Sequence, residues 1–186
     1  KVRVGDLATG LDVDEKTVAC GDELVKYDKC VLATGSYPFV PPIPGKDLPG
    51  VFVYRTIDDL EALVAYQTAH GVESAAVIGG GLLGLEAAKA MHDLGMKTHI
   101  LEYAPILMCR QIDQGGHDAL VGMVEDLGLE VHCDARTKAF EADAESRVSR
   151  VTFETEGWDD LEVGIVVVSA GIRPRDEVAR DAVECH

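Results

Sequence analysis

A glycine-rich turn between an apolar stretch and an Ala-rich stretch constrains this sequence more than any other feature. Residues 74–78 read Ser-Ala-Ala-Val-Ile, and Gly79, Gly81 and Gly84 follow at the spacing Gly-x-Gly-x-x-Gly. In this context the spacing predicts a strand, a tight turn and a helix whose N-terminus can bind an anion. The first glycine permits the turn, the second lets a pyrophosphate approach the backbone, and the third lets the helix pack closely on the sheet. The motif predicts a dinucleotide site, with an ordinary βα turn of another α/β protein as the alternative.

An acidic residue at the end of the next predicted strand indicates which dinucleotide binds. Glu102 follows the stretch 98–101 at the right distance to accept hydrogen bonds from the adenosine ribose. A carboxylate there would repel the 2′-phosphate of NADP, and residues 103–105 (Tyr-Ala-Pro) contain no base to receive it. The nearest base along the chain is Arg110, which leaves some room for NADPH. The sequence therefore predicts a preference for NAD(H).

Composition excludes several other classes of partner. The formal charge of −16, from 33 acidic and 17 basic residues, disfavours nucleic acid and anionic membrane surfaces. No apolar run is long enough to cross a bilayer, and the mean hydropathy is +0.06. Five cysteines and six histidines are scattered without metal-ligand or disulfide spacing. We expect a cytoplasmic protein with reduced thiols, mostly in packing roles, and no metal site.

The chain divides into zones of different periodicity. Residues 2–34 suggest short strands, at 2–4, 11–13, 17–20 and 27–34, and a proline-rich connector follows at 37–45. Helical periodicity begins at Thr56 with a capping signal. Beyond it we expect parallel strands at 75–78, 98–101, 129–133 and 165–168, helices at 82–94 and about 114–127, and an antiparallel meander within 137–163. The expected fold class is α/β, a Rossmann-like parallel sheet with an antiparallel β-meander insertion.

Three separated motifs resemble the flavin-dependent pyridine nucleotide oxidoreductases that carry two dinucleotide-binding domains. The first is Val-Leu-Ala-Thr-Gly-Ser at 31–36 with Pro-Ile-Pro-Gly at 42–45, the second is the glycine turn, and the third is residues 166–174. Residues 36–47, 54–60 and 111–116 are most similar to nitrite-reducing members, with rubredoxin and ferredoxin reductases as near neighbours. Two positions depart from the family pattern: Gly164 where an Asp is frequent, and Cys109 where a Pro is common.

The resemblance implies the domain organisation and the chemistry. Residues 1–45 would be an incomplete FAD-domain segment and connector, 46–170 an NAD(H)-binding domain, and 171–186 the start of the return to the FAD domain. NADH would reduce FAD in the intact protein, and electrons would pass to siroheme and an iron–sulfur cluster outside this chain. The expected partners are NADH and the remainder of the same polypeptide, with a homodimer possible. The chain alone is expected neither to retain FAD nor to be active, and it carries no catalytic or metal-binding residue.

The resemblance also assigns roles to individual positions. Glu86 would contact the nicotinamide ribose or carboxamide, unless it is a solvated first-turn acid that only complements the helix dipole. Gly171 would provide a backbone contact on the nicotinamide side. The cofactor-binding residues implied in this way are Thr34, Gly35, Gly79, Gly81, Leu82, Leu83, Gly84, Glu86, Glu102, Tyr103, Arg110, Ala170 and Gly171. A non-catalytic nucleotide-sensing module would share the glycines and Glu102, and a methyltransferase is disfavoured by the meander.

Overall fold

The computed structural model describes residues 2–180 and 182, which fall into two compact units. The first unit combines residues up to Tyr37 with those from Ile172 onward, and the second unit spans Pro38–Gly171. Residues 181 and 183–186 of the expected returning segment, Cys185 among them, lie outside the described residues.

A five-stranded parallel sheet forms the centre of the second unit. Its strand order is β5 (Val51–Val53), β12 (Ile165–Val168), β6 (Ser74–Ile78), β7 (Lys97–Leu101) and β8 (Glu130–His132). The helices α1 (Ile57–His70), α2 (Leu82–Asp93) and α3 (Gln114–Asp126) connect β5 to β6, β6 to β7 and β7 to β8. An antiparallel meander of β9 (Thr137–Ala142), β10 (Val148–Phe153) and β11 (Leu161–Glu162) leads from β8 back to β12. The α/β class, the parallel sheet and the inserted meander predicted from the sequence are confirmed.

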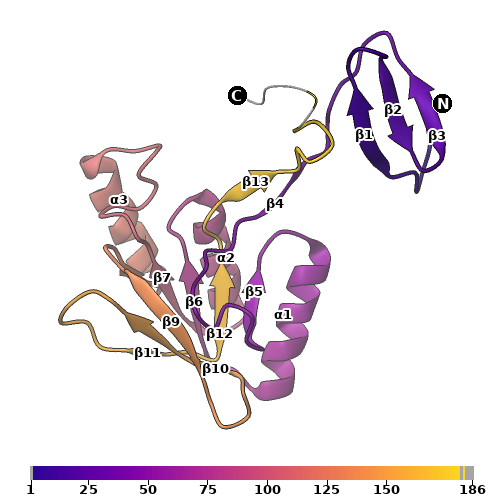
Figure 1. Ribbon diagram of the computed structural model, residues 1–186. Helices are drawn as coiled ribbons and strands as arrows, with labels where there is room; N and C mark the ends of the chain where they lie inside the picture. The colour runs from indigo at the N-terminus through magenta and orange to yellow at the C-terminus, as the bar shows by residue number, and fades with distance from the viewer. Residues whose placement is uncertain (1, 181, 183–186) are drawn as a thin grey trace. The chain divides into compact units, whose positions relative to one another are not determined.

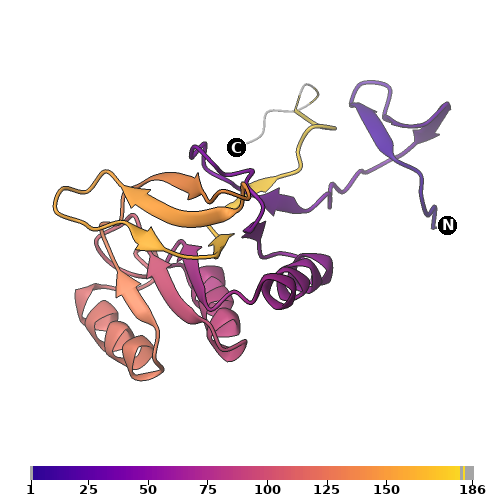
Figure 2. The ribbon, with the colours of Figure 1, turned by 90° about the horizontal axis from the view of Figure 1, so that it is seen from below.

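Helices and meander cover opposite faces of this sheet (Figures 1 and 2). On the helical face, Leu63 of α1, Met91 of α2 and Val124 of α3 pack on alternate residues of the strands, such as Val77 and Ile165. On the other face the remaining strand residues meet the meander through Phe140, Val148 and Val151. All four residues of β12 are buried, because both faces of this central strand are covered. That continuous burial explains why the run at 165–168 is apolar without alternation.

Local sequence signals set the ends of the first helix. Thr56 accepts a hydrogen bond from the backbone N–H of Asp59, whose carboxylate accepts one from the backbone N–H of Thr56. This reciprocal pair is the predicted capping signal, and it satisfies two of the backbone groups that a helix start leaves unpaired. Gly71 ends the helix in the left-handed conformation, with φ of 60°.

The first unit contains β strands, but not all of those predicted. β1 (Ala8–Asp12), β2 (Thr17–Cys20) and β3 (Glu23–Lys26) form an antiparallel sheet, and β4 (Ser36–Pro38) pairs with β13 (Ile172–Pro174). The strands predicted at 2–4 and 27–34 are absent. Val2, Val4, Val31 and Leu32 in these segments remain exposed, since no described strand pairs with either segment. In the second unit, strand β5 was not predicted, because its three residues are too few to show an alternation of apolar and polar side chains.

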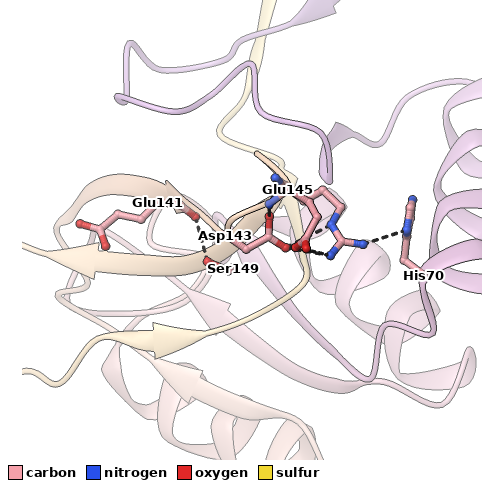
Figure 3. Close-up of polar contacts among 6 residues, drawn as sticks. His70, Glu141, Asp143, Glu145 and Ser149 are labelled. Carbon is pink, nitrogen blue, oxygen red and sulfur yellow. Dashed lines mark hydrogen bonds and ion pairs between the residues drawn. The ribbon is translucent and has the colours of Figure 1, made fainter.

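Polar contacts hold the turn between β9 and β10 against the end of α1 (Figure 3). The Asp143 carboxylate accepts hydrogen bonds from the backbone N–H groups of Glu145 and Arg147 and from the Arg147 guanidinium. These bonds lower the pKa of Asp143. Nη1 of Arg147 lies 3.1 Å from Nδ1 of His70, the last residue of α1. The meander is therefore tied to the helical layer at this end of the sheet.

No described helix is long and apolar enough to cross a membrane.

Replacing Leu63 by Ala is expected to lower the free energy of unfolding by about 3 kcal/mol, because the fully buried side chain leaves a cavity. Ile57→Ala, which removes similar atoms from a 75 % exposed position of the same helix, is expected to change it by less than about 0.5 kcal/mol. Urea denaturation of both variants tests the packing of α1. Equal losses would contradict it.

Candidate nucleotide-binding site

The ends of three parallel strands converge on the glycine turn after β6. The backbone N–H of Gly79 donates to the carbonyl of Leu101 at the end of β7, at 2.8 Å. Gly79 has φ of 118°, and a β-carbon on it would lie 2.4 Å from the carbonyl oxygen of Ser169, which follows β12. Any other residue at position 79 would be strained at this φ, and its β-carbon would clash with the backbone of Ser169. The turn thus lies at the carboxyl edge of the sheet, where open α/β sheets bind ligands.

Gly84 and Gly81 differ sharply in the space around them. A β-carbon on Gly84 would lie 1.9 Å from the carbonyl oxygen of Gly79, so α2 approaches the end of β6 more closely than an Ala would permit. A β-carbon on Gly81 would meet no atom within 4 Å. Gly81 is the N-cap of α2 and no side chain caps this helix end. The start of α2 therefore combines open space at Gly81 with backbone N–H groups that no side chain caps, as an anion site requires.

The Glu102 side chain is fixed beside the turn. One carboxylate oxygen accepts a hydrogen bond from the backbone N–H of Gly80 at 2.5 Å, and the other accepts from the N–H of Ala104 at 2.7 Å. Each oxygen keeps a further lone pair that a ribose hydroxyl could use. Gly80 was not selected from the sequence, although a β-carbon there would lie 2.4 Å from Leu107. The sequence does contain a sign of this role, because Gly80 is the middle residue of the run Gly-Gly-Gly at 79–81.

A base that was not selected from the sequence, Arg136, lies beside Tyr103, the residue after Glu102. The Arg136 guanidinium lies 5.8 Å from the centroid of the Tyr103 ring, within the range of a cation–π contact. Arg136 is near because residues 134–136, after β8, run beside residues 102–104, after β7. The adjacency of the two strand ends was predictable from the parallel sheet, whereas sequence distance pointed to Arg110, which is exposed.

The remaining predicted positions on α2 are all exposed. Leu82 and Leu83 lie in its first turn and leave 68 % and 42 % of their surface accessible. Glu86 is exposed in the second turn, and the first turn contains no acidic residue. Glu86 is therefore solvated, as the alternative interpretation expected, but it lies in the second turn of α2 and not in the first.

The predicted positions in the first and third of the three family motifs lie in different units. Ala170 and Gly171 follow β12 in the second unit; Ala170 packs on the meander side, and the carbonyl of Gly171 accepts a hydrogen bond from Phe39. Thr34 and Gly35 belong to the first unit, where Thr34 donates to the carbonyl of Arg175 and Gly35 accepts from its N–H.

The four described cysteines are free thiols. Cys133 packs against the helical core, but Cys30 and Cys109 are exposed. The expectation that most cysteines fill packing positions is therefore wrong for these two.

A parallel sheet with a glycine turn leading into an uncapped helix, and an acid after the next strand, is the arrangement of Rossmann-type dinucleotide-binding domains. The family model described as pyridine nucleotide-disulphide oxidoreductase matches residues 1–186. The chain belongs to this family.

Several curated relatives are nitrite reductases. The chain is 44 % identical over 180 residues to the nitrite reductase (NADH) large subunit of Escherichia coli K12, covering 96 % of this chain and 21 % of that protein. It is 38 % identical to the nitrite reductase [NAD(P)H] of Bacillus subtilis, covering 92 % and 21 %. The chain thus spans about a fifth of the length of these relatives.

Solved structures share the fold. A NAD-dependent persulfide reductase from A. fulgidus matches with a TM-score of 0.84 at 28 % identity, covering 95 % of this chain and 32 % of that one. A ferredoxin reductase from Rhodopseudomonas palustris matches with a TM-score of 0.83 at 26 % identity, covering 96 % and 43 %.

Gly84→Ala is expected to destabilise the fold by about 1–3 kcal/mol, since the added methyl group would overlap the Gly79 carbonyl. The matched control is Gly122→Ala, in an exposed part of α3 where a β-carbon meets nothing within 4 Å. That variant is expected to stabilise the protein by up to about 1 kcal/mol, because Ala favours helix. Urea denaturation measures both, and a Gly84→Ala protein as stable as the parent would contradict the close packing.

Proposed function

We propose that this chain is the NADH-binding part of a flavoprotein reductase. The observation that carries the proposal is the turn at 79–84, where open space at Gly81 adjoins the uncapped start of α2 and the Glu102 carboxylate. The pyrophosphate would accept hydrogen bonds from the N–H groups of Leu82 and Leu83, and Glu102 would accept from the adenosine ribose. The similarity to enzymes named for NADH or NAD(P)H supports the choice of ligand.

We further propose that the intact protein reduces nitrite. The relatives with 38–44 % identity are named as nitrite reductases, and this similarity runs through both units of the chain. When bound, FAD would take the hydride of NADH and release electrons singly toward a siroheme and iron–sulfur centre elsewhere in the polypeptide. The role of this chain's own residues is to bind the nucleotide and orient its nicotinamide end, with Glu86, Ala170 and Gly171 as candidates.

The first unit would be part of the FAD domain, completed by the remainder of the polypeptide. Val2, Val4 and Val31 each leave 86–90 % of their surface exposed, which is unusual for apolar side chains in a finished domain. Residues 27–35, with the Ala-Thr-Gly motif, form no strand and are nearly all exposed. Both features fit a segment whose pairing strand and covering side chains come from the rest of the protein.

NADH is expected to bind at least about tenfold more tightly than NADPH, a difference of about 1.4 kcal/mol, because Glu102 would repel the 2′-phosphate. Glu102→Gln is expected to narrow this ratio by removing the charge, and Arg136→Gln to widen it by removing the base near Tyr103. Isothermal titration of the three proteins with both nucleotides tests the assignment. Equal or tighter binding of NADPH by the unmodified chain would overturn it.

Gly81→Val is expected to weaken NADH binding by more than about tenfold while the protein stays folded, because the side chain would fill the space meant for the pyrophosphate. Gly122→Val makes the same change at an exposed position of α3 and is expected to leave the affinity unchanged. Circular dichroism confirms folding, and titration with NADH measures binding. A folded Gly81→Val protein with normal affinity would show that the turn is only structural.

A further inference from the structure

Two histidines and a glutamate meet on the meander side of the sheet, away from the glycine turn. His99 lies on β7, and Glu130 and His132 lie on β8, with His99 paired directly to Glu130 in the register of the two strands. Because alternate residues of a strand point to the same face, residues 99, 130 and 132 share one face. This is the face that carries Leu101 toward the meander.

The three side chains direct one donor atom each toward a common point. Nδ1 of His99 lies 3.1 Å from Nε2 of His132 and 3.2 Å from Oε2 of Glu130, and the third distance, from His132 to Glu130, is 4.0 Å. Ligand atoms around a tetrahedral zinc ion, with bonds of 2.0–2.2 Å, are separated by about 3.3 Å. Two distances already match this value and the third needs a small rotation of an exposed side chain.

The surroundings hold the three groups in the forms that a metal requires. His99 is 3 % exposed, and burial lowers the pKa of both His99 and His132, which favours neutral imidazoles. The Lys97 ammonium binds the other carboxylate oxygen of Glu130 at 2.9 Å and keeps the pKa of this acid low. Metal ligands need deprotonated carboxylate and neutral imidazole.

An aromatic contact restrains the His132 side chain. The Trp158 ring packs edge-on against the His132 ring, with centroids 5.9 Å apart, and Phe153 packs on Trp158. Among the described residues, His99, Glu130 and His132 form a group of three potential metal ligands whose donor atoms all lie within 4.8 Å of one another.

We propose that His99, Glu130 and His132 form a binding site for a divalent transition metal of the zinc type. Two imidazole nitrogens and one carboxylate oxygen are a ligand set that Zn²⁺ uses, and three protein ligands leave a fourth position for water. Each neutral imidazole would bind the metal through one nitrogen, Nδ1 of His99 or Nε2 of His132, and keep its proton on the other ring nitrogen, so no net proton is released. The site joins β7 to the edge strand β8 and shares no side chain with the proposed nucleotide site.

This site leaves no spacing pattern in the sequence, because its ligands come from two strands separated by α3. Histidines 33 positions apart show no ligand spacing, and the group forms only when β7 and β8 pair. Lys97 has two opposite effects on the site: it keeps Glu130 ionised, but its positive charge lies beside the same carboxylate that would hold the metal. At neutral pH the repulsion outweighs the first effect, because a glutamate ionises there without a neighbouring base. Its removal is therefore an informative variant.

The test uses chelator-treated protein titrated with Zn²⁺ in a calorimeter and with Co²⁺ by visible absorption. We expect one ion per chain, tetrahedral d–d bands, and no charge-transfer band from a thiolate. Glu130→Gln and His132→Phe are expected to weaken binding by more than about tenfold, and Lys97→Gln to strengthen it. Phe preserves a ring against Trp158, so the second variant separates ligand loss from lost packing.

His70→Gln, which changes an exposed histidine outside the group, serves as the matched control and is expected to bind metal like the parent. Zn²⁺ is also expected to raise the melting temperature of the parent and of His70→Gln but not of His132→Phe. A thiolate charge-transfer band, binding unchanged in folded Glu130→Gln and His132→Phe, or no binding by the parent would each overturn the proposal.

Discussion

The close approach of α2 to the end of β6 is the constraint on which the rest of this structure depends. A β-carbon on Gly84 would lie 1.9 Å from the carbonyl oxygen of Gly79, so this close approach of the helix requires glycine at position 84. That approach directs the first N–H groups of α2 toward the carboxyl edge of the sheet. It also places Gly80 where its N–H reaches Glu102, which fixes the acid before any ligand arrives.

Features encoded by neighbouring residues were predictable from the sequence. The glycine turn, the capping box at Thr56 and Asp59, and the buried run of β12 each follow from a pattern of a few residues. Features made by distant residues were not. Arg136 reaches Tyr103 only because two strand ends lie side by side, and the expected strand at 27–34 failed because strand formation requires a partner as well as apolar residues.

Strands β7 and β8 connect two chemically different regions of the sheet. At their carboxyl ends, the carbonyl of His132 accepts a hydrogen bond from the backbone N–H of Glu102, at 2.8 Å. On the face of the sheet toward the meander, the side chain of the same His132 meets those of His99 and Glu130. The hydrogen-bonded pairing of β7 and β8 therefore positions both Glu102, beside the glycine turn, and the imidazoles of His99 and His132. The two sites have no side chain in common.

The position of β12 has a consequence for how the chain acquires its structure during synthesis. Strand β5 pairs with β12 alone, with Val51 opposite Val166. β5 is the first strand of this sheet to be synthesised and β12 is the last, so β5 has no partner in the sheet until β12 has been made. Until the ribosome releases the meander and β12, β6 has only β7 as a neighbour and one edge of the nascent sheet is open. Non-local parallel pairing of this kind is slow and exposes apolar edges to aggregation. Assembly of this sheet therefore ends with a strand that must pair with β5 on one side and β6 on the other.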